Sequence, residues 1–137
     1  HTPQFNEETL SDDLIKVGIC YTHLGSLGGL RHTTKDSKNI GWHNKSFRGY
    51  ADYMQTADFS NGIDELIAIT GQHRTAIMCA EVLPWRCHRS LIGDAMLVRG
   101  WRVLDIYNEH TVKDESITQF ANVDGMVITY PDDIDRR

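Results

Sequence analysis

Apolar segments of two lengths alternate along the chain, and this alternation constrains the fold more than any other feature. The longer segments carry apolar side chains at helical spacing and cover residues 6–17, 58–70 and 86–99. The shorter segments are rich in β-forming residues and cover 19–24, 75–79 and 101–107. Such alternation is typical of parallel strands joined by right-handed helical crossovers. The sequence therefore predicts an α/β fold with three layers, α/β/α, around a mostly parallel sheet.

Three shorter elements complete this prediction. Helices are expected over residues 49–55 and 115–121, and an edge strand over 126–130. A chain of 137 residues is long enough for one hydrophobic core, so we expect a single α/β domain over residues 1–137.

Charge and cysteine content restrict the class of partner. The formal net charge of -5 disfavours nucleic acid as a general partner. No apolar run approaches the roughly 20 residues of a membrane helix, so no membrane partner is expected. The three cysteines show no spacing typical of a disulfide framework, which favours a reducing, cytoplasmic setting. The oligomeric state is left open.

A long polar stretch over residues 25–48 is a candidate binding loop. Arg31, Trp42 and Arg48 combine guanidinium groups with an aromatic face, which suits a flat anionic ligand such as a nucleotide. The alternative is a flexible surface loop without a binding role, in which Trp42 only anchors the loop to the core. Phe47 and Tyr53 are expected to be such anchors.

The segment from Cys79 to Arg89 is the predicted functional centre. Cys79 would end a strand covered on both faces, and a helix follows it. Ligands of open α/β sheets bind beyond the carboxyl ends of strands, where His23 would also lie. The start of a helix favours negative charge, so a thiol there becomes a better nucleophile. We therefore predict Cys79 as a nucleophile or key polar contact.

The side chains after Cys79 suit an anion. Arg86 and Arg89 supply fixed positive charge and paired donors for phosphate or carboxylate. Glu81 is a candidate general acid or base, or else the partner of one of these arginines. His88 would pair with Cys79 or a ligand, or else bond to backbone in the first helical turn.

Two familiar chemistries fit this segment less well. Six residues separate Cys79 from Arg86, one more than in cysteine-dependent phosphatases, so the loop would not wrap a phosphate in the same way. Zinc could be held by Cys79, Cys87 and His88, but their spacing matches none of the usual short pairs. We predict no metal and no cofactor, and expect Cys20 and Cys87 to be buried apolar side chains.

Several motifs resemble the family known as domain of unknown function 488. They are Thr2–Asn6, His23–Gly25 with Leu27–Gly29, Phe47–Met54, and Met78–Glu81 running into Pro84–Ile92. The resemblance implies an α/β fold without an assigned activity. Members of that family usually begin with a further strand and helix, so the resemblance implies that this chain lacks the family's N-terminal βαβ portion.

Three functions follow from these residues. The leading hypothesis is an intracellular enzyme acting on a phosphate- or nucleotide-bearing small molecule through the turn at Cys79. The second is a non-catalytic module that binds a nucleotide or nucleic acid. The third is a structural site supported by a metal.

Overall fold

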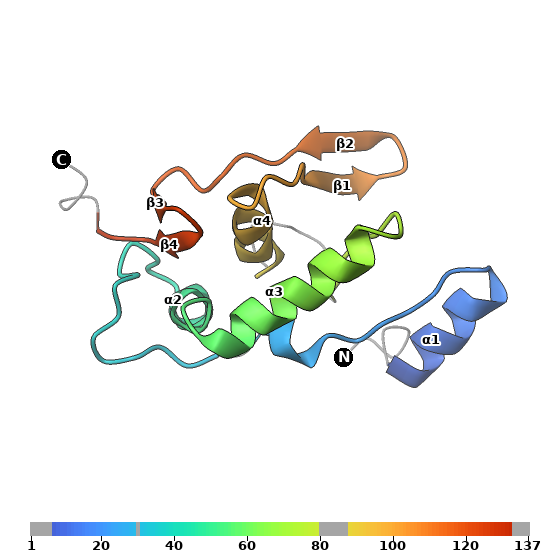
Figure 1. The fold of residues 1–137 in the computed structure, drawn as a ribbon, viewed down its shortest axis with the longest axis horizontal. Helices are drawn as coiled ribbons and strands as arrows, with labels where there is room; N and C mark the ends of the chain where they lie inside the picture. Colours follow the sequence, from blue (N-terminus) through green and yellow to red (C-terminus); the bar gives the residue numbers. More distant parts are fainter. Residues whose placement is uncertain (1–6, 30, 80–87, 133–137) are drawn as a thin grey trace.

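The computed structural model describes residues 7–29, 31–79 and 88–132. Within them lie four α-helices and one short 3₁₀ turn: α1 Glu7–Lys16, η2 Gly25–Leu27, α2 Lys45–Tyr53, α3 Ala57–Thr70 and α4 Arg89–Leu97. The strands are β1 Leu104–Asn108, β2 Thr111–Asp114, β3 Asn122–Asp124 and β4 Val127–Thr129. Figure 1 shows α3 crossing the centre of the molecule, with α4 and both strand pairs on one side of it.

The prediction of a mostly parallel sheet in a three-layer α/β/α arrangement is wrong. The described strands form two separate sheets of two strands each, β1 with β2 and β3 with β4, and both pairs are antiparallel. Short connections explain this pairing, because only antiparallel neighbours can be joined by a tight hairpin. Residues 109–110 connect β1 to β2, and β3 turns into β4 through Gly125, whose φ of 61° favours glycine.

Two predicted strands do not form. Residues 19–24 contain no strand, and Cys20, expected to be buried, is exposed. Residues 75–79 also contain no strand, and Met78 is 49% exposed rather than covered on both faces. A strand needs a neighbour that satisfies its backbone groups, and within the described chain no strand lies beside either segment.

The helices follow the apolar spacing more closely. Residues 6–17 and 58–70 contain α1 and α3 almost as predicted, and α2 begins four residues earlier than expected, behind Asn44. Asn44 caps α2 because its side chain accepts hydrogen bonds from the backbone N–H groups of Ser46 and Phe47. The predicted helix over 86–99 is confirmed as α4, although its first two residues lie outside the described part. No helix forms over 115–121.

Three helices and one strand enclose the core. Buried side chains of α2, α3, α4 and β4 form a single cluster that includes Tyr50, Phe59, Ile63, Leu91 and Ile128. Tyr130, directly after β4, is fully buried in the same cluster. In contrast, α1 leaves Ile15 63% exposed. None of the described helices is both long and apolar enough to cross a membrane.

The polar stretch before α2 is anchored by one carboxylate, Asp52. It accepts hydrogen bonds from the hydroxyls of Thr33 and Ser37, the backbone N–H of Thr34 and the side-chain amide of Asn39, at 2.6–2.8 Å. Gly49, one turn earlier on α2, makes room for this chain, since a Cβ there would overlap the carbonyl oxygen of Arg31. The stretch is therefore held against α2 rather than extending loosely into solvent.

Candidate functional site

His88 stands at the start of α4 and packs against two earlier parts of the chain. Its ring centroid lies 4.8 Å from that of Tyr50 on α2. On another side it approaches Gly29, where a Cβ would come within 3.1 Å of His88 Nδ1. The backbone carbonyl of His88 accepts the first bonds of α4, from Leu91 and Ile92. His88 is thus positioned by packing as well as by the helix that it opens.

The turn beside His88 is fixed by two tyrosines. Tyr50 donates its hydroxyl hydrogen to the carbonyl oxygen of Leu27 at 2.7 Å, and Tyr53 donates to that of Ser26 at 2.6 Å. Gly62 on α3 lets the turn approach, because a Cβ there would overlap the Ser26 hydroxyl. Such satisfied buried contacts make η2 a rigid wall next to His88.

Arg31, a predicted ligand-binding residue, forms its hydrogen bonds with this turn. Its guanidinium donates to the carbonyl oxygens of Gly28 and Gly25, at 3.1 and 3.0 Å. The same group lies 3.8 Å over the ring of Tyr53, a cation–π distance. Arg31 therefore supports the wall of the site, and a ligand would have to replace these contacts to bind it.

Arg89 follows His88 and faces a carboxyl group on β1. Burial raises the pKa of Asp105 above its ordinary value, and the positive charge of Arg89 partly opposes this increase. The two groups are thus close enough to interact electrostatically. An anion that reaches Arg89 would compete with Asp105 for the guanidinium.

Two further acids and a tyrosine extend this neighbourhood, and none of them was predicted from the sequence. Asp94 on α4 is 1% exposed and accepts from the Thr118 backbone N–H, the Thr118 hydroxyl and the Tyr130 hydroxyl. Glu115 lies beside it, and its buried Oε2 atom has no hydrogen-bond partner among the described residues. Burial, then the negative charges of Asp105 and Asp94, raise the pKa of Glu115 to about 8.

A glycine on α4 explains how Glu115 fits there. A Cβ at Gly93 would overlap Oε2 of Glu115, so the bare backbone of the helix accommodates the carboxyl group. One signal in the sequence could have revealed this region. Asp94 falls among Leu91, Ile92, Ala95 and Met96 on the apolar face of the helix, where a charged side chain requires a partner.

The other predicted residues lie elsewhere. Trp42 packs against Phe47, Phe120 and Tyr130, with ring centroids 4.8–5.5 Å apart, as an anchor of the loop. Arg48 donates to the Trp42 carbonyl oxygen at 3.0 Å. His23 lies beside α1, where it lines an open hollow of about 640 Å³ with Glu8, Ser11, Asp12 and Tyr21.

The centre of the predicted segment is only partly described. Cys79 is half-buried and is not in a disulfide bond. Glu81, Arg86 and Cys87 lie outside the described residues, so their predicted roles stay predictions. Of the candidates that the structure does describe, it brings together His88 and Arg89 at the start of α4, with Arg31 supporting the adjacent turn.

The described residues contain no group of three or more His, Cys, Asp or Glu side chains that could hold a metal ion. Comparison with curated proteins and with solved structures finds no match in either set. One family does match: the Domain of unknown function DUF488 covers residues 1–96. This span includes His88, Arg89, the η2 turn and both tyrosines, and it amounts to more than half of the chain. The chain therefore belongs to the DUF488 family.

Proposed function

We propose that the start of α4 binds the phosphate or carboxylate of a small molecule, with a nucleotide-bearing compound as the preferred class, and that the protein is an enzyme acting on it. Cys79 would be the nucleophile or a key polar contact, and Arg86 and Arg89 would hold the anion. Glu81 or His88 would transfer protons. The observation that carries the proposal is the placement of His88 and Arg89 together at the first turn of a helix.

The positive end of a helix supports an anion there. The aligned peptide dipoles of a helix favour negative charge at its first turn. α4 has nine residues, and its first turn carries no acidic side chain. His88 makes no side-chain capping bond to this helix.

The same contacts favour a small ligand over a nucleic acid. A nucleic-acid surface would need several exposed cations on one face. Two of the arginines predicted for such a patch, Arg31 and Arg48, already donate to backbone carbonyl oxygens. An extended nucleic-acid interface therefore has less support than a compact anion site.

Anion binding can be tested through Arg89 and its competitor. Titration with inorganic phosphate and with AMP, followed by amide chemical shifts of α4, should show binding that weakens at least about tenfold in Arg89→Gln. Arg74→Gln, an exposed arginine outside the site, is the matched control. Asp105→Asn should tighten binding, because it removes the carboxyl group that faces Arg89. Equal affinities in all four proteins would refute the anion site.

The nucleophile is tested by thiol reactivity. Cys79 should react with iodoacetamide at a pH well below the roughly 8.5 at which an ordinary thiol ionises. Exposed Cys20 provides the internal reference, and Cys79→Ser assigns the signal. If the pH profiles of the two thiols coincide, Cys79 is not an activated nucleophile.

A further inference from the structure

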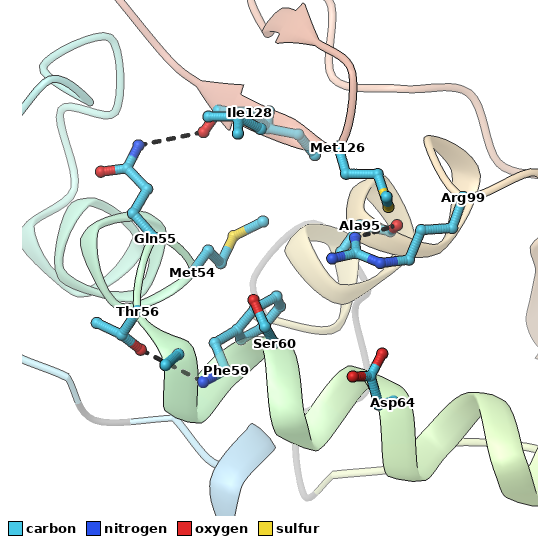
Figure 2. A pocket seen from close by; sticks show the side chains of 12 residues that line it. Met54, Gln55, Thr56, Phe59, Ser60, Asp64, Ala95, Arg99, Met126 and Ile128 are labelled. Carbon is cyan, nitrogen blue, oxygen red and sulfur yellow. Dashed lines mark hydrogen bonds between the residues drawn. The ribbon is translucent and has the colours of Figure 1, made fainter.

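A second pocket lies away from the start of α4, between the α2–α3 junction, the end of α4 and the β3–β4 turn. Its volume is about 420 Å³, within the range of small-molecule sites in proteins. Figure 2 shows its wall formed by Met54 and Phe59 below and by Ile128 above, with Met126 at the edge. Phe59 and Ile128 belong to the buried core, so the pocket has a fixed apolar base.

One side of the pocket is closed by a hydrogen bond between distant segments. Gln55, directly after α2, donates its side-chain amide to the carbonyl oxygen of Ile128 at 3.2 Å (Figure 2). This bond holds β4 at a set distance from the helices. The pocket is therefore a built feature of the packing between α2, α3 and β4.

Opposite charges lie at the other end of the pocket. Asp64 rises from α3 and Arg99 descends from the residues after α4, and both side chains turn toward the same end (Figure 2). Within the described residues they form no ion pair with each other or with another group. Arg99 uses one nitrogen, Nη1, to donate to the Ala95 carbonyl oxygen at 2.8 Å, and its other donors remain available. Among the described residues, no hydrogen-bond donor reaches the Asp64 carboxylate.

We propose that this pocket binds a small zwitterion with an apolar side chain, of the α-amino acid class. The ammonium group would bind the Asp64 carboxylate, and the carboxylate would bind the free donors of Arg99. The apolar side chain would lie against Met54, Phe59 and Ile128. A ligand with both charges satisfies both side chains, whereas a ligand with one charge leaves the other without a partner. This site is independent of the proposed anion site.

Three matched probes separate the contribution of each charge. L-leucine carries both groups, 4-methylpentanoate lacks the ammonium group, and 3-methylbutylamine lacks the carboxylate. Calorimetry should give L-leucine a dissociation constant no weaker than about 1 mM, and each single-charge analogue should bind at least about tenfold more weakly. Amide shifts should change at Gln55, Ser60 and Val127 and leave those of Ser90 and Leu91, in the first turn of α4, unchanged.

Variants test the same contacts from the protein side. Asp64→Asn and Arg99→Gln should each weaken L-leucine binding at least about tenfold. Asp58→Asn on the same helix is exposed and does not line the pocket, so it should bind as the wild type does. The proposal is overturned if L-leucine does not bind at about 10 mM. It is equally overturned if 4-methylpentanoate binds as tightly as L-leucine, or if the shifts lie outside the pocket.

Discussion

Asp52 and Glu115 are both shielded from solvent, but their surroundings shift the pKa of the two carboxyl groups in opposite directions. Burial alone would raise the pKa of Asp52, yet hydrogen bonds from Ser37, Thr34, Asn39 and Thr33 hold it below its ordinary value. Glu115 is partly buried beside two other acids, Asp105 and Asp94, and these surroundings raise its pKa to about 8. Among the described residues, its buried Oε2 atom has no hydrogen-bond donor. At Asp52 the hydrogen-bond donors together outweigh burial, whereas at Glu115 burial and neighbouring negative charges prevail.

The two groups therefore stabilise different parts of the chain in different protonation states. Ionised Asp52 holds residues 33–39 against α2. Protonated Glu115 packs against α4 at Gly93, and Asp94 keeps its three donors from Thr118 and Tyr130. Asp105, whose charge raises the pKa of Glu115, also interacts electrostatically with Arg89, so the charge balance of the second region extends to the proposed anion site.

Removing the anchoring carboxylate should have the largest effect. Asp52→Ala leaves five donor groups of the loop without their acceptor, and the loss should be about 3–5 kcal/mol in the free energy of unfolding. Urea denaturation measures this loss. Asp36→Ala, an exposed acid of the same loop, should change stability by less than about 0.5 kcal/mol. Equal losses for the two variants would contradict the role of Asp52.

The next effect concerns the fit of Glu115 against α4. Gly93→Ala places a Cβ where Oε2 of Glu115 lies, so it should destabilise the protein by about 1–3 kcal/mol. In a Glu115→Ala background the same change should stabilise by about 0.5–1 kcal/mol, because alanine favours a helix interior over glycine. A double-mutant cycle in urea detects this reversal of sign. Additive effects would show that the two residues do not interact.

These two regions also show how far the sequence could predict the fold. Helical periodicity located α1, α3 and α4, since their apolar faces are local patterns in the chain. Residues 19–24 and 75–79 have strand composition but no neighbouring strand, and composition alone cannot supply that neighbour. Parallel order was inferred from alternation, yet the short turns at residues 109–110 and Gly125 required antiparallel hairpins.

The candidate site was predictable in part for the same reason. The position of His88 and Arg89 at the start of a helix followed from local sequence. Asp94, Asp105 and Glu115 come from α4, β1 and the segment after β2, so only tertiary packing brings these acids together. The helix expected over 115–121 is replaced by these contacts, because the Thr118 N–H donates to Asp94 and Glu115 is drawn to Gly93.

The pH dependence of stability separates the two carboxyl groups further. Folding raises the pKa of Glu115 from 4.5 to about 8, so the folded protein holds this proton more tightly than the unfolded chain. Its contribution is complete below pH 4.5 and is lost as the pH rises through about 8. Glu115→Gln should flatten this part of the profile, and above a pH of about 8 the variant should be more stable than the wild type. Glu65→Gln, an exposed control on α3, should retain the wild-type slope.

Asp52 should show the opposite sign at acid pH. Its pKa is lowered by folding, so the stabilisation that it provides is present above the ordinary value of 3.8 and is lost as the pH falls below it. Acid titration of wild type and Asp52→Asn, followed by tryptophan fluorescence, should show that only the wild type loses this contribution. If the wild type and Asp52→Asn lose stability equally at acid pH, the pKa of Asp52 is the same in the folded and the unfolded protein.

The smallest effect should come from one donor of the Asp52 cluster. Thr33→Val removes a single hydroxyl at 2.8 Å from Asp52, but Ser37, Asn39 and the Thr34 N–H still bind the carboxylate. The loss should be about 0.5–1 kcal/mol, and Thr33→Ser, which keeps the hydroxyl, should lose less. Thr118→Val should cost more than Thr33→Val, because Asp94 is more deeply buried and then keeps only the Thr118 N–H and the Tyr130 hydroxyl. If the two valine variants lose equal stability, the number of remaining donors does not explain the difference between these regions.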